Sequence, residues 1–152
     1  HDFQCSRHAV ELTAERGITV GGHIIIGLPG ETAEESIAQA HVMSLLPLDI
    51  LKIHQMQIIK GTRLAAMYAE NPFHLYTPDE YTETIISYLE HLRPDIAVER
   101  FASQSPKDLL IAPQWGLKNY ELTNLVVNKM KREGRYQGSL STESNLSIAI
   151  PG

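Results

Sequence analysis

The chain has 152 residues, with 13 basic and 18 acidic side chains and a formal net charge of −5 at neutral pH. This acidic balance argues against the broad cationic surface that nucleic-acid binding requires. Hydrophobic residues make up 43% and charged residues 20%, which is typical of one globular domain and excludes an intrinsically disordered chain. The single cysteine, Cys5, excludes an internal disulfide, a multi-cysteine zinc site and an iron–sulfur cluster held by this chain's thiolates alone.

Three further features of the sequence concern the extent and the location of the chain. The first residue is His1 rather than Met, which predicts a chain that is processed or belongs to a longer one. The longest apolar stretch, near residues 24–26, is far shorter than the ~20 residues of a membrane span. No charged segment followed by an apolar run opens the chain, as a secretion signal would require. We therefore expect a soluble, cytoplasmic protein without a membrane partner.

Helices and strands are predicted to alternate along the chain. Helices are expected where apolar residues recur at helical spacing, and strands where β-branched residues cluster between breaks. In chain order, the expected elements are a helix at 5–16, a strand at 18–28, a helix at 33–46, a strand at 49–59, a helix at 63–69, a helix at 78–92, a strand at 95–102 and a helix at 119–132. Capping boxes, Thr32 with Glu35 and Thr77 with Glu80, mark two of the helix starts.

The alternation predicts an α/β fold built from parallel β/α units with right-handed crossovers. The chain begins on a helix, whose own strand would lie upstream in a β/α barrel. A complete barrel takes roughly 250 residues, so three strands cannot close one. We therefore expect residues 1–138 to be the C-terminal part of a partial, TIM-like barrel with a C-terminal extension. The Ser-rich segment 139–152 is expected to be a flexible tail.

The strongest local motif is the glycine-rich turn between the first strand and the following helix, GHIIIGLPGET. Ligands bind at the carboxyl ends of parallel strands, and glycines there let a ligand approach the backbone. A phosphate-binding P-loop would need Lys where this chain has Glu31 and Gly where it has Ile25, so the sequence argues against nucleoside triphosphate binding. The alternative is a plain strand-to-helix turn, with Glu31 favouring the positive end of the helix.

Two later strands carry charged residues. On the second strand Lys52, His54 and Met56 share one face, so this row points into a cavity or toward water, with a solvated edge strand as the alternative. On the third, Arg100 is expected to share a face with Ile96 and Val98. An arginine at the carboxyl end of a strand suits a carboxylate or a phosphate, with a structural ion pair as the alternative.

These segments together resemble a known family. HIIIGLPGET resembles the fifth-strand motif of the radical S-adenosylmethionine (radical SAM) superfamily, and DILKIHQMQIIKGT resembles its sixth strand. The pattern continues through LYTPDEYTETIISYLEHLRPDIAVERFASQ and LLIAPQW. The combination is similar to the YhcC-like iron–sulfur oxidoreductases, relatives of the Elongator-type radical SAM proteins, over about residues 1–140.

The resemblance implies a cofactor pair. A 4Fe–4S cluster would reduce S-adenosylmethionine to methionine and a 5′-deoxyadenosyl radical, which abstracts hydrogen from a substrate. It implies that Lys52 and Arg100 face the substrate. It also implies cofactor-binding residues on the turn and at the end of the second strand, namely Ile25, Gly27, Leu28, Pro29, Gly30, Glu31, His54, Gln55, Met56 and Gln57. The family often has Gly where this chain has His23.

The cysteine count departs from the family. The family binds its cluster through three closely spaced cysteines in an N-terminal segment, whereas this chain has only Cys5. We therefore expect a C-terminal piece of a radical SAM oxidoreductase that is inactive alone and ligates no metal itself. The alternative is a non-catalytic α/β module that binds proteins. The substrate, whether a small molecule, an RNA or a protein, is not indicated, and a free sheet edge would permit a homo-oligomer.

Overall fold

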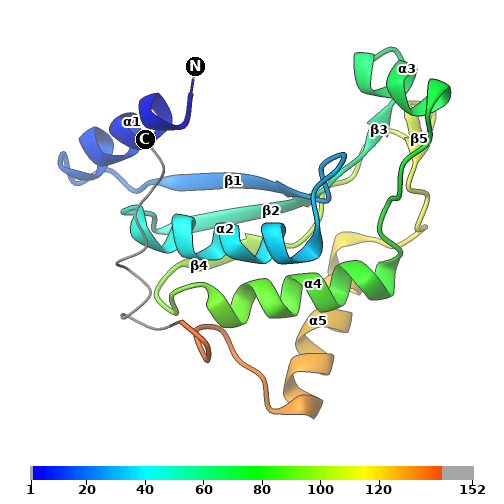
Figure 1. The fold of residues 1–152 in the computed structure, drawn as a ribbon. Coiled ribbons are helices and arrows are strands. Elements are labelled where there is room, and N and C mark those ends of the chain that lie inside the picture. The colour runs from blue at the N-terminus through cyan, green and yellow to red at the C-terminus, as the bar shows by residue number, and fades with distance from the viewer. Residues whose placement is uncertain (1, 142–152) are drawn as a thin grey trace.

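The computed structural model describes residues 2–141, and its centre is a three-stranded parallel sheet in the order β1-β2-β4 (Figure 1). A second, two-stranded sheet pairs β3 with β5. The strands are β1 (Gly21–Ile26), β2 (Ile50–Gln55), β3 (Ile58–Ile59), β4 (Ala97–Arg100) and β5 (Leu110–Ala112). The helices are α1 (Phe3–Ala14), α2 (Ala33–Leu45), α3 (Arg63–Glu70), α4 (Pro78–His91) and α5 (Asn119–Glu133).

The predicted helices are confirmed to within two residues at each end. Both capping boxes are formed: the Glu35 amide donates to the Thr32 hydroxyl over 3.1 Å, and the Thr32 amide donates to the Glu35 carboxylate over 2.8 Å. Thr77 and Glu80 repeat the arrangement at α4. These helix starts depend only on neighbouring residues, which is why the sequence predicts them well.

The strands fit the prediction less closely. The parallel arrangement of the three expected strands is confirmed by the register of β1 with β2 and of β2 with β4. The strand expected over residues 49–59 is wrong in extent, because β2 ends at Gln55 and residues 58–59 leave for a different sheet. There β3 pairs antiparallel with β5, which the sequence analysis did not predict. A strand of three residues is too short to show a periodicity.

The central strand β2 separates a buried face of the sheet from an open one. Leu51, Ile53 and Gln55 are buried against the side of α2 and α4, which pack on each other. Figure 1 shows both helices along the same face of the sheet. Lys52 and His54, which alternate with the buried side chains, are only half-buried. We call the opposite face the open face and define it by His23, Ile25, Lys52, His54 and Arg100.

An irregularity in the register between β2 and β4 corrects one prediction. Leu51 pairs with Val98, whereas the next residue, Lys52, pairs with Arg100, so Glu99 is an extra residue in β4. Such a bulge turns the following side chain to the other face of a sheet. Arg100 therefore shares a face with Lys52, and the expectation that it shares one with Val98 is wrong. Val98 itself packs on the core.

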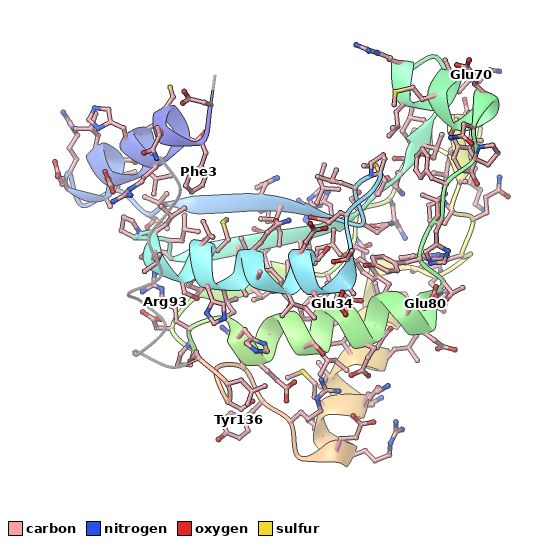
Figure 2. All side chains as sticks on the ribbon, in the orientation of Figure 1. Phe3, Glu34, Glu70, Glu80, Arg93 and Tyr136 are labelled. Atoms are coloured by element: carbon pink, nitrogen blue, oxygen red, sulfur yellow. The ribbon has the colours of Figure 1, made fainter. Side chains whose placement is uncertain are left out.

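The segment after α5, where Figure 2 labels Tyr136, is fastened to α4 by Arg135. Its guanidinium contacts the carboxylates of Glu83 at 2.5 Å, Glu90 at 2.7 Å and Glu133 at 3.3 Å. Farther along, the Leu140 amide donates to the Glu90 carbonyl over 2.8 Å. The tail expected over residues 139–152 lies mostly outside the described residues. Within residues 2–141, no helix is long and apolar enough to cross a membrane.

We expect Arg135→Gln to lower the free energy of unfolding by about 1.5–3 kcal/mol, because hydrogen bonds to charged groups are worth that much when one partner is lost. The Arg135 side chain is only 20% exposed, so water replaces its contacts poorly. Arg132→Gln is the control, since Arg132 is 71% exposed and contacts Glu133 at 3.5 Å. Urea unfolding of both variants measures the difference, and equal losses would contradict a fastening role for Arg135.

Candidate functional site

The turn that follows β1 is held by the carboxylate of Glu31. One of its oxygens accepts from the Gly27 amide over 3.0 Å and from the Leu28 amide over 3.1 Å. The other accepts from the side-chain amide of Gln39 on α2. This geometry also argues against a P-loop, because the amides that would face a phosphate are already bonded to a carboxylate of the chain.

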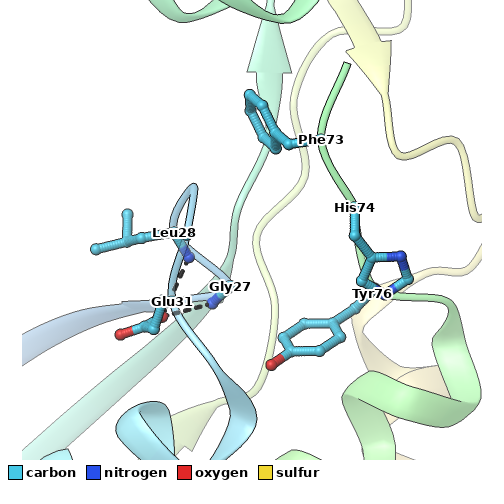
Figure 3. A pocket seen from close by; sticks show the side chains of 7 residues that line it. Gly27, Leu28, Glu31, Phe73, His74 and Tyr76 are labelled. Carbon is cyan, nitrogen blue, oxygen red and sulfur yellow. Dashed lines mark hydrogen bonds between the residues drawn. The ribbon is translucent and has the colours of Figure 1, made fainter. Parts of the chain in front are cut away.

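A pocket of about 290 Å³ lies beside this turn at the carboxyl end of β1. Figure 3 shows the turn on one side and a segment from between α3 and α4 on the other. The residues that line it are Gly27, Leu28, Gly30, Glu31, Phe73, His74 and Tyr76. Its volume is close to the lower end of the range of roughly 300–1,000 Å³ typical of small-molecule sites.

The aromatic wall of the pocket is fixed from behind. The Trp115 indole N–H donates to the Tyr76 carbonyl over 2.9 Å, and the Trp115 ring lies 5.1 Å from that of buried Tyr81. The imidazole of His74 contacts Glu80 at 3.3 Å. The sequence analysis missed Phe73, His74 and Tyr76, since they lie in a segment without regular structure. The aromatic and histidine composition of that segment was the one available signal.

Gly27 is required at the edge of the pocket by its conformation and by its neighbour. Its φ of +86° lies in the left-handed region, which L residues with a side chain rarely adopt. A Cβ at this position would also lie 3.0 Å from the Tyr76 ring. The glycine therefore lets the turn and the aromatic wall approach each other closely.

The two glutamines at the end of β2 hold the chain that follows β4. The Gln55 side-chain amide donates to the Ser103 carbonyl and accepts from the Ser103 amide, both over 2.9 Å. The Gln57 side-chain carbonyl accepts from the Ser105 hydroxyl over 2.8 Å. Between them, the Met56 amide donates to the Ile26 carbonyl over 3.0 Å, which joins the end of β2 to the end of β1.

The open face gathers nitrogen-bearing side chains from all three strands. The rings of His23 and His54 lie 5.4 Å apart, between centroids. Lys52 contacts Glu99 at 3.0 Å, and Arg100 contacts it at 3.8 Å. Burial lowers the pKa of His54 from 6.5, and the nearby charges of Arg100, His23 and Lys52 lower it further. Both effects favour the neutral form of the His54 imidazole.

Apart from the residues at the end of β2, the structure thus places the predicted residues in two groups. Gly27, Leu28, Gly30 and Glu31 line the pocket, while Pro29 is exposed at the tip of the same turn. Ile25, Lys52, His54 and Arg100 lie on the open face. The ends of β1 and β2 are adjacent, since Ile26 pairs with Gln55. The two groups therefore meet along the carboxyl edge of the sheet.

Within the described residues, no group of three or more His, Cys, Asp or Glu side chains is arranged to hold a metal ion. Cys5 is a free, exposed thiol on α1. A single thiolate does not fit a 4Fe–4S cluster, which is held by several cysteines.

Comparison with known proteins places the chain in a family. Residues 48–132 match the Radical_SAM C-terminal domain. The chain is 32% identical over 140 residues to an uncharacterized protein of Methanocaldococcus jannaschii, covering 91% of this chain and 44% of that protein. It is 29% identical over 115 residues to Protein YhcC of Escherichia coli strain K12, covering 76% of this chain and 37% of YhcC.

A solved structure shares the fold. The archaeal Methanocaldococcus infernus Elp3 with an N-terminal deletion superposes with a TM-score of 0.78 over 90% of this chain and 32% of that one, at 22% sequence identity. The chain belongs to the Radical_SAM C-terminal domain family, and the prediction of the radical SAM superfamily is confirmed. It spans less than half the length of the M. jannaschii protein and of YhcC.

We expect Gly27→Ala to destabilise the chain more than Gly17→Ala. Both glycines have positive φ, so alanine introduces backbone strain of about 1–2 kcal/mol at either position. At Gly17 nothing lies within 4 Å of the added Cβ, whereas at Gly27 the added Cβ meets the Tyr76 ring. Thermal or urea unfolding measures the stability of both variants. An equal loss of stability would contradict the prediction, because it would show that the Tyr76 ring moves aside without a cost in free energy.

Proposed function

We propose that this chain is the part of a radical SAM oxidoreductase that faces S-adenosylmethionine and the substrate. In this proposal its three parallel strands are the C-terminal part of a partial (β/α) barrel, and residues 1–138 form one domain. The observation that carries the proposal is the pocket at the carboxyl end of β1, within a chain of the Radical_SAM C-terminal domain family. Ligands of parallel α/β folds bind at this edge.

The pocket fits the adenosyl part of S-adenosylmethionine. Leu28, Phe73 and Tyr76 offer apolar and aromatic surface, which suits the flat faces of a purine. Glu31 occupies the Gly27 and Leu28 amides, so we assign it the role of keeping the turn in shape rather than of contacting the ligand. With a reduced iron–sulfur cluster, S-adenosylmethionine supplies a 5′-deoxyadenosyl radical.

The end of β2 would complete this site. Met56 lies beside the turn through its hydrogen bond to Ile26, and His54 pairs with Ile25 on the neighbouring strand. We assign His54 and Met56 to contacts with the ligand. Gln55 and Gln57, also predicted as cofactor-binding residues, would act by holding Ser103 and the segment around it.

The cluster itself is proposed to be ligated outside these 152 residues. Cys5 is the one cysteine of the chain, so this chain supplies at most one of the several thiolates that a 4Fe–4S cluster needs. The 152-residue chain alone would therefore be inactive. Its own contribution would be to bind and orient S-adenosylmethionine and the substrate.

We expect S-adenosylmethionine to shift the amide NMR signals of Gly27, Leu28, Gly30 and Met56, and 5′-deoxyadenosine to shift the same set. Leu28→Gln should weaken both ligands, because it places a polar group in the pocket wall. Leu109→Gln is a matched control, since Leu109 is 40% exposed and Leu28 is 42% exposed. Equal binding by the two variants, or shifts confined to other segments, would refute this site.

Reconstitution with iron and sulfide tests the assignment of the cluster. We expect the 152-residue chain to show no visible charge-transfer absorption of an iron–sulfur cluster after desalting, and Cys5→Ser to behave in the same way. A stable cluster spectrum that disappears in Cys5→Ser would show that this chain contributes a ligand, and would contradict the proposal.

A further inference from the structure

The open face carries a row of cationic and donor side chains across three adjacent strands. His23 on β1 pairs in register with Lys52 on β2, and Lys52 pairs with Arg100 on β4. Neighbouring strands lie ~4.8 Å apart, so this row spans ~10 Å. His54, two residues beyond Lys52, stacks near His23 and extends the row toward the carboxyl edge. The chain as a whole is acidic, which makes this row a local exception.

Two buried atoms in the row have no hydrogen-bond partner. The Nε2 atom of His54 and the Nε atom of Arg100 are both buried from solvent and unpaired. A buried polar atom without a partner costs about 1–3 kcal/mol, so the row has unused capacity for hydrogen bonds. The bulge at Glu99 brings Arg100 into the row, because it turns this side chain toward Lys52 and His54.

Glu99 is the acidic partner that the structure gives this row. It is 46% exposed and contacts both Lys52 and Arg100. One carboxylate against a lysine and an arginine leaves a net charge of +1, before any proton on the histidines is counted. An exposed carboxylate can swing into water, so an incoming anion could take its place.

We propose that the row formed by His23, Lys52, His54 and Arg100 binds a phosphate ester group. A phosphate monoester presents three terminal oxygens, which suits donors that arrive from several strands, whereas a carboxylate presents two and satisfies fewer of them. Lysine contributes a point charge and arginine a planar fork of donors. The assignment of this phosphate to the substrate rests on the proposed function. The binding of phosphate by the row does not depend on the proposed function.

The first experiment titrates the chain with inorganic phosphate at constant ionic strength and follows the imidazole NMR signals of His23 and His54. Phosphate should shift both signals and raise the pKa of His54 toward 6.5, because the anion offsets the charges of Arg100, His23 and Lys52 that lower it. Acetate at the same concentration should have at most a small effect. Equal effects of acetate and phosphate would overturn the choice of phosphate.

Variants test the row directly. Lys52→Met and Arg100→Met should each weaken phosphate binding about tenfold or more, because each removes a charged donor. Glu99→Gln should tighten it, because the competing carboxylate is gone. This opposite change cannot arise from loss of folding. Lys107→Met is the control, since Lys107 is an exposed lysine outside the row. Unchanged affinity in the first two variants, or weaker binding by Glu99→Gln, would overturn the proposal.

The test of phosphate binding can succeed or fail independently of the test of the cofactor site. Phosphate binding by the row, without any S-adenosylmethionine shift at Gly27 to Gly30, would support the row and refute the cofactor site. S-adenosylmethionine that shifts Lys52 and Arg100 as strongly as phosphate does, and competes with it, would assign the row to the methionine carboxylate. That result would overturn the phosphate proposal while supporting the cofactor site.

Discussion

The two-residue alternation of side chains along β2 is the constraint on which the rest of the structure depends. Because β2 lies between β1 and β4, it is bonded on both edges, and its side chains have only two directions in which to point. Leu51 and Ile53 anchor the packing of α2 and α4, while Lys52 and His54 are left on the other side. A shift of one residue would bury a lysine among apolar side chains, so the register is strongly specified.

Structural features that depend on neighbouring residues could be predicted well from the sequence. Features that depend on the pairing of distant segments could not. The capping pairs at Thr32 and Thr77 are readable because both partners lie within four residues. The departure of residues 58–59 from the line of β2 depends on pairing with β5, some 50 positions later, and no short window contains that information. The bulge at Glu99 is similar, since it exists only relative to the register of β2.

The candidate site shows the same division. The turn drew attention through its glycines and its place after a strand, and the family resemblance implied that its residues from Gly27 to Glu31 bind the cofactor. Four of them line the pocket. The opposite wall, Phe73 to Tyr76, was missed because its position is set by Trp115, about 40 residues away. The chemical role expected of Glu31 also became sharper. In the sequence, the charge of Glu31 argues against a phosphate-binding loop. In the structure, the Glu31 carboxylate accepts hydrogen bonds from the Gly27 and Leu28 amides, which would face the phosphate in such a loop.

The fastening of residues after α5 has a practical consequence. The Gly138 amide donates to the Leu89 carbonyl and the Leu140 amide to the Glu90 carbonyl, so this segment meets α4 at its C-terminal end. That end lies near the start of β4, at the amino edge of the sheet, whereas the pocket lies at the carboxyl edge. A fluorophore or spin label attached near Ser139 would therefore sit at a fixed place remote from the pocket. It would give a reference point for distance measurements to ligands bound there.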